Sequence, residues 1–114
     1  MMRVVVFVCL FVAVGLVAPE LVLAQSASPY DMTYKARKDT VMRAAPEAGS
    51  AAKGNLARGT AGIVLRWCRP EIPFNRWQFG GRGTWRILLD ERVCEISSGG
   101  KVGFVDGVNL DPAR

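Results

Sequence analysis

The stretch GNLARGTAGIVLRWC, from Gly54 to Cys68, decides how this chain folds. Turn residues stand at Arg58-Gly59-Thr60, and a run of apolar residues, Ile63-Val64-Leu65, follows them. A short apolar run that is rich in β-branched residues and bounded by turn signals is typical of a β-strand. The stretch therefore predicts two strands, Gly54–Ala57 and Thr60–Trp67, within a small all-β domain.

Further short strands are expected on both sides of this stretch. Thr40–Arg43 alternates apolar and polar side chains and ends before a turn at Pro46. Arg92–Ile96 and Lys101–Val105 also read as strands, and a Ser-Ser-Gly-Gly turn separates them. Residues 25–39 show no clean periodicity, and we expect a flexible, extended lead-in there.

The first 24 residues have the pattern of a secretory signal peptide. Arg3 precedes an unbroken apolar run from Val4 to Ala18, and small residues stand before a cleavage point between Ala24 and Gln25. A membrane anchor is the alternative, but a spanning helix needs about 20 apolar residues and this run is shorter. We therefore expect an exported protein, periplasmic or secreted, with no membrane span in the mature chain.

Export bears on the two cysteines of the mature chain, Cys68 and Cys94. Cys9 lies in the signal segment, so the mature chain keeps an even pair. In an oxidising compartment such a pair is expected to form a disulfide. Closing this loop would stabilise the domain by about 3.5 kcal/mol in the chain-entropy view. Two free thiols in the core are the alternative.

Three motifs, taken in order, resemble the pattern of bacterial SH3-like domains. They are VMRAAPE, GNLARGTAGIVL and GGKVGFVDGVNL, which begin at Val41, Gly54 and Gly99. The resemblance implies a small barrel of five or six strands over residues 40–112. It also implies a role in binding peptides or cell-wall material outside the cytoplasm. The chain departs from the family at Phe104, where a tryptophan is common.

A long insertion is the larger departure from that family. A short turn would join the Leu65 strand to the Val93 strand in a compact member, whereas residues 67–91 stand between them here. If these two strands are antiparallel neighbours, Cys68 and Cys94 lie at the far end of the pair, within disulfide reach. Their bond would then clamp the insertion at its root.

The insertion is expected to be ordered but irregular in its first half. Two prolines three residues apart argue against a central strand, so Arg69–Gly83 is interpreted as a long ordered loop. Beyond it, Trp85, Leu88 and Leu89 fall at helical spacing, which predicts a short helix capped by Thr84. A strand over the same residues is the alternative.

Aromatic and arginine side chains interleave in the insertion and make it the candidate binding surface. Such residues dominate the hot spots of interfaces, and they suit a proline-rich peptide, sugar rings or a polyanion. Alternatively, the aromatics cover one end of the barrel and enlarge a thin core. Both hold if Trp67 and Trp85 lie inside while Phe74 or Trp77 faces solvent. The candidate ligand-binding residues are Trp67, Arg69, Phe74, Arg76, Trp77, Phe79 and Trp85.

The residue inventory argues against catalysis. The chain has no histidine, which excludes Ser-His and Cys-His nucleophile pairs and histidine-containing metal sites. The expected disulfide leaves no thiolate. Asp90 and Glu91 are adjacent and resemble a solvated turn rather than two carboxylates across a cleft. We therefore predict a protein that is not an enzyme and has no cofactor and no metal.

The net charge of +5 suits anionic partners, but the basic residues are spread along the chain. We interpret the charge mainly as an aid to solubility, and export makes nucleic acid a poor partner. The predicted function is a non-catalytic exported binding module that contacts cell-wall material or a peptide through the insertion. The alternative is an interaction subunit that docks on another envelope protein. A carboxylate enzyme is the third hypothesis.

Overall fold

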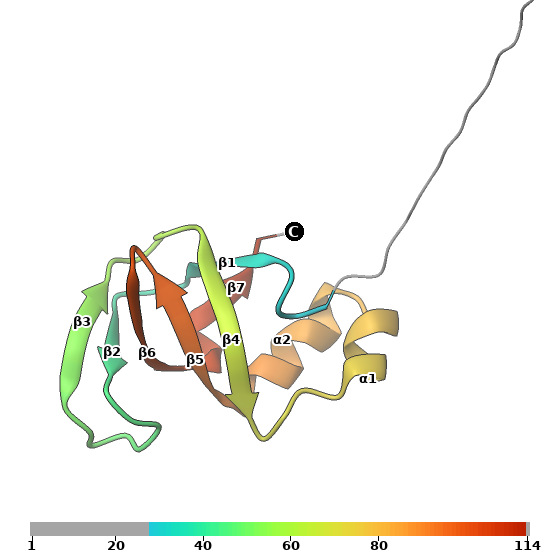
Figure 1. Cartoon of the computed structure of the whole chain (residues 1–114). Coiled ribbons are helices and arrows are strands. Elements are labelled where there is room, and N and C mark those ends of the chain that lie inside the picture. Colours follow the sequence, from blue (N-terminus) through green and yellow to red (C-terminus); the bar gives the residue numbers. More distant parts are fainter. Residues whose placement is uncertain (1–27, 114) are drawn as a thin grey trace, which may run out of the picture.

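The computed structural model describes residues 28–113, and the predicted signal peptide lies outside these residues. The described part of the chain forms seven strands, two α-helices and one 3-10 turn (Figure 1). In chain order these are β1 (Thr33–Ala36), β2 (Thr40–Arg43), β3 (Ala52–Leu56), β4 (Ile63–Arg69), α1 (Phe74–Phe79), α2 (Arg82–Asp90), β5 (Val93–Ser98), β6 (Lys101–Asp106), η2 (Gly107–Asn109) and β7 (Leu110–Pro112).

The strands form one curled antiparallel sheet in the order β3-β2-β6-β5-β4-β1-β7. The two helices lie together beside one end of the sheet (Figure 1). The expectation of a mostly β, barrel-like domain is confirmed in this broad form. The sheet has seven strands, however, where five or six were predicted, because segments outside the predicted barrel strands also pair.

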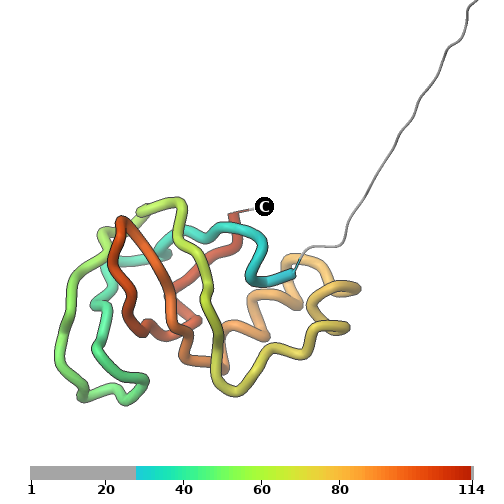
Figure 2. The backbone as a smooth tube through the Cα atoms, in the orientation of Figure 1, coloured from blue at the N-terminus to red at the C-terminus, as the bar shows by residue number. Residues whose placement is uncertain are grey.

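One of the unexpected strands lies in the predicted lead-in. Residues 33–36 form β1, which pairs with β4 on one side and β7 on the other. Met32, Tyr34 and Ala36 alternate with exposed residues and are buried in the core. The interpretation of this segment as flexible was therefore wrong. Figure 2 shows the N-terminal strand running beside the C-terminal end of the chain.

The strands that the sequence predicted are present with shifted ends. β2 has the predicted bounds, while β3 begins two residues before Gly54. β5 and β6 form a hairpin whose turn places Gly99 and Gly100 at positive φ, a conformation that glycine adopts at little cost. β4 continues to Arg69, so the inserted segment begins at Pro70 rather than at residue 67.

The core lies on the inner face of the curled sheet. Ile63 and Leu65 of β4 are buried while Val64 between them is exposed, as the two-residue period of a strand requires. A β-bulge between Leu65 and Trp67 shifts this phase by one residue. Cys68 therefore points into the core, and Trp67 lies half-buried on the outer face.

The insertion is more helical than predicted. Pro73 stands at the N-cap of α1, a place near the helix start that tolerates proline because no backbone donor is needed there. α2 confirms the predicted helix and excludes the strand alternative. It begins at Arg82 after Gly81, so Thr84 lies inside its first turn and does not cap it. α2 buries Leu88 and Leu89 and packs against η2 and β7.

Candidate functional site

The root of the insertion is closed by the disulfide that the sequence predicted. Cys68 of β4 and Cys94 of β5 are register partners, with their Cα atoms 4.0 Å apart. Both residues are buried. The bond therefore joins the two strands between which the insertion leaves and returns to the sheet, and the prediction of its position is confirmed.

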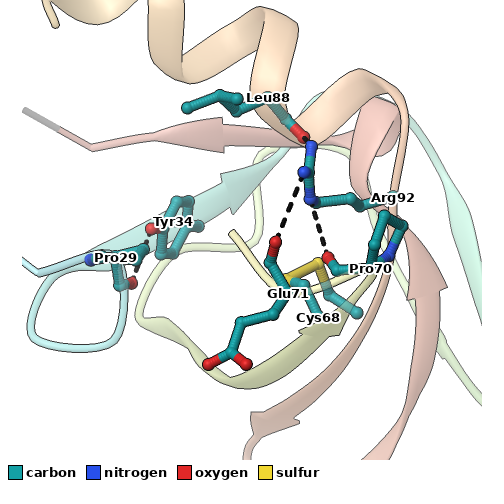
Figure 3. The surroundings of a disulfide bond; sticks show 8 residues. Pro29, Tyr34, Cys68, Pro70, Glu71, Leu88 and Arg92 are labelled. Atoms are coloured by element: carbon teal, nitrogen blue, oxygen red, sulfur yellow. Dashed lines mark hydrogen bonds between the residues drawn. A yellow bond between two sulfur atoms is a disulfide. The ribbon is translucent and has the colours of Figure 1, made fainter. Parts of the chain in front are cut away.

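Arg92 also holds the two ends of the insertion together, next to the disulfide. Its guanidinium donates to the carbonyl oxygens of Pro70 (2.7 Å) and Leu88 (2.6 Å), and more weakly to that of Glu71 (3.4 Å). The side chain is only 8% exposed. Figure 3 shows it extending from the start of β5 toward these carbonyls, near the disulfide. One buried cation thus holds both the first residues of the insertion and the end of α2.

The inward side of the insertion is an aromatic stack. The Trp77 and Trp85 rings are stacked with centroids 5.0 Å apart and planes at 6°, and Trp85 Nε1 donates to the Trp77 carbonyl at 2.7 Å. Tyr34 of β1 approaches Trp77 at 6.5 Å. Trp77 and Tyr34 are fully buried. These side chains join the helices to the sheet, so this part of the candidate set belongs to the core.

Burial also governs the chemistry of the tyrosines. Loss of contact with water raises the pKa of the Tyr34 phenol well above its ordinary value, and its hydroxyl donates to the Pro29 carbonyl at 2.6 Å. Burial likewise raises the pKa of Tyr30, with a further contribution from the Glu71 carboxylate. Both phenols therefore stay protonated at neutral pH and act as packing and hydrogen-bonding groups.

Trp67 and Arg69 lie elsewhere, on the outer face of the sheet. The Trp67 ring meets Phe104 of β6 edge-on at 5.4 Å, and the Arg69 guanidinium lies 4.9 Å from the Trp67 ring centroid. Glu95 pairs in register with both aromatics and accepts a hydrogen bond from Arg66 at 3.0 Å. The Trp67 ring is thus partly covered by its own neighbours. Sequence reasoning did not include Phe104 in the site.

The outward side of the insertion presents apolar side chains to solvent. Phe79 at the end of α1 is 83% exposed and Phe74 at its start is 50% exposed. Ile87 on α2 is 55% exposed, and sequence reasoning missed it. Arg76 lies exposed between the two phenylalanines in sequence. We call Phe74, Arg76, Phe79 and Ile87 the outer helix surface.

The seven candidate residues therefore do not form one site. Trp77 and Trp85 belong to the core, Trp67 and Arg69 to the outer sheet face, and Phe74, Arg76 and Phe79 to the outer helix surface. Of the two residues expected to face solvent, Phe74 or Trp77, only Phe74 does so, because the Trp77 ring fills the space between the helices and β1. Trp67 is half-buried outside the sheet rather than inside the barrel, because the β-bulge in β4 turns it outward.

Within residues 28–113, no group of three or more acidic or cysteine side chains is placed to hold a metal ion. Over the same residues, no helix is long and apolar enough to cross a membrane. No protein-family model, curated protein or solved structure matches the chain. The resemblance to bacterial SH3-like domains therefore rests on the three sequence motifs alone.

Proposed function

We propose that this protein is an exported, non-catalytic, SH3-like binding module, and that its outer helix surface contacts cell-wall material or a peptide in the envelope. The observation that carries the proposal is the exposure of Phe79 and Phe74 on a helix whose opposite side packs into the core through Trp77. Large apolar side chains gathered on a surface are a frequent sign of an interaction site.

The bracing matters because it lowers the cost of binding. The disulfide and Arg92 fix the root of the insertion, and the Trp77–Trp85 stack fixes its inward side. A surface held in this way loses little conformational entropy when a partner docks on it. Arg76 is also exposed on α1 and adds a cation to the outer helix surface, which suits a carboxylate on a wall peptide or at a peptide terminus.

The free aromatic groups favour peptide over sugar as the part of the ligand that is recognised. Within residues 28–113, Phe74 and Phe79 are the aromatics most open to solvent, whereas the indole rings of Trp67, Trp77 and Trp85 are stacked or partly covered. An open indole face is the better platform for a sugar ring. The peptide portion of the wall polymer is accordingly the contact that we propose.

Co-sedimentation of the purified exported protein with peptidoglycan, at low and at moderate salt, tests the proposal. We expect the wild type in the pellet at both salts, and we expect Phe74→Ser combined with Phe79→Ser to leave it. The matched control is Val41→Ser combined with Val108→Ser, which removes two other exposed apolar side chains. Binding that disappears at moderate salt would reduce the interaction to charge attraction and overturn the proposal.

A second candidate function is docking on another envelope protein. Ile87 favours it, because α2, which packs against α1, also carries a large exposed apolar side chain. Three results together would select this function instead. One defined protein would co-purify with the wild type, the Phe74→Ser and Phe79→Ser double variant would lose that protein, and the wild type would not bind peptidoglycan.

A further inference from the structure

Basic residues that are far apart in the sequence come together along the β1–β7 edge of the sheet. Lys35 of β1 and Asp111 of β7 are register partners and so share one face. Arg37 follows two residues after Lys35, and Arg58 arrives from the turn between β3 and β4. These side chains line an open depression of about 380 Å³, together with Ala36 and Gly59.

Charge balance in this region is strongly positive. The Asp111 carboxylate accepts hydrogen bonds from Arg82 at 2.8 Å and from Arg86 at 3.5 Å, so α2 already supplies it with two cations. Among the described residues, the ion pairs within 4.0 Å include none formed by Lys35, Arg37 or Arg58.

The remaining nearby contacts leave these three side chains largely available. The Arg37 guanidinium donates once, to the Val108 carbonyl at 3.0 Å. Asp39, the other acid close by, accepts from the backbone N–H of Arg58 at 2.8 Å rather than from its side chain. The region therefore holds five cations and two carboxylates. Arg82 and Arg86 already pair with Asp111, and the three cations that line the depression have spare donors.

We propose that this edge, the basic surface formed by Lys35, Arg37, Arg58, Arg82 and Arg86, binds an anionic polymer that bears repeated phosphate or carboxylate groups. Arginine forks and lysine ammonium groups recognise such anions. These residues come from β1 and the residue that follows it, the β3–β4 turn and α2, and none of them belongs to the outer helix surface.

A polymer is favoured over a lipid bilayer by the shape and composition of the depression. It is concave, and its lining includes no large exposed apolar side chain that could insert between lipids. Asp111 lines the depression, so Arg82 and Arg86, which pair with it, extend the positive charge from the depression onto α2, along which a chain of anionic groups could lie. Neutralising several charges along one polymer makes binding sensitive to salt.

Titration of the purified exported protein with long-chain inorganic polyphosphate, followed by calorimetry at several salt concentrations, tests this inference. The test variant carries Lys35→Gln, Arg37→Gln and Arg58→Gln. The control carries Lys53→Gln, Arg66→Gln and Lys101→Gln, which removes the same charge from exposed positions outside the depression. We expect the test variant to bind about tenfold more weakly or worse, with a flatter dependence on salt, and the control to change by about twofold or less.

Equal weakening of both variants would overturn the inference, because it would indicate general charge attraction. Failure of the wild type to bind polyphosphate at low salt would overturn it as well. Tighter binding to vesicles of anionic phospholipid, with the same loss in the test variant, would make a membrane the partner. Arg58→Gln alone leaves the backbone bond to Asp39 intact, and it must weaken binding measurably even if the triple variant does not fold.

Discussion

Trp77 and Phe79 lie two residues apart on the same short helix and meet opposite environments. The Trp77 side chain is fully buried against Trp85 and Tyr34, whereas the Phe79 side chain is 83% exposed. The difference shows that the two sides of an aromatic-rich insertion in a small domain meet different environments. Its inward side packs into the core, and its outward side is exposed to solvent and is the contact surface that we propose.

The largest effect is expected on the inward side. Trp77→Ala should lower the free energy of unfolding by about 3–5 kcal/mol, because it removes a fully buried ring and leaves a cavity next to Trp85. Urea unfolding followed by circular dichroism measures this change. A loss below about 1 kcal/mol would mean that the insertion contributes little to the core and that its inward and outward sides do not differ as described.

The disulfide should contribute nearly as much. Replacing Cys68 and Cys94 together by alanine is expected to lower the free energy of unfolding by about 3.5 kcal/mol, since the closed loop restricts the unfolded chain. The same protein reduced with a thiol reagent serves as the matched comparison in urea unfolding. Identical midpoints for the oxidised and reduced wild type would show that the root of the insertion holds without the bond.

A smaller effect is expected from the ionisation of Tyr34. Burial raises its pKa in the folded protein above the ordinary value near 10, so the stability that it contributes is complete below that pH and declines above it. At about pH 11 the loss amounts to about 1.4 kcal/mol, because the phenol ionises in the unfolded chain and not in the folded one.

Urea unfolding at about pH 9 and about pH 11 measures this loss, and Tyr34→Phe should make the dependence flatter. The dependence of the free energy of unfolding on pH that remains in that variant is due in part to Tyr30, because burial also raises the pKa of this residue. Absorbance of phenolate near the ordinary pKa in the folded wild type would contradict the buried position of Tyr34.

The smallest effect on stability is expected on the outward side. Phe79→Ser should change the free energy of unfolding by about 0.5 kcal/mol or less, because its ring leaves solvent only slightly on folding. Phe74→Ser should cost somewhat more, since half of its side chain is covered. Thermal unfolding of both variants beside Trp77→Ala ranks the three positions. A change for Phe79→Ser close to that of Trp77→Ala would remove the distinction between the two sides.

Much of the sheet could be predicted because its strands carry local signals. Branched apolar residues mark β4, and a glycine turn marks the β5–β6 hairpin. The disulfide could be predicted from the strand order and from the expectation of export. β1 was missed although Met32, Tyr34 and Ala36 alternate with polar residues, because three apolar positions that include an alanine give a weak pattern and pairing to β4 and β7 is non-local.

The candidate site was less accessible to sequence reasoning, because burial depends on contacts between distant segments. No pattern near Trp77 shows that β1 will stand against it, and the β-bulge that turns Trp67 outward has no signature in the sequence. Pro73 marks the start of α1, but its closeness to Pro70 was interpreted as a sign of a loop. The basic surface escaped notice because its residues come from β1, the β3–β4 turn and α2.

Hydrogen–deuterium exchange of the purified protein, with and without soluble peptidoglycan fragments, tests the division of the insertion most directly. We expect slower exchange in residues 74–80 when the fragments are added and no change in the β5–β6 hairpin. Unchanged exchange in α1, or protection confined to other segments while the fragments are bound, would contradict the claim that the outward side of the insertion is the contact surface.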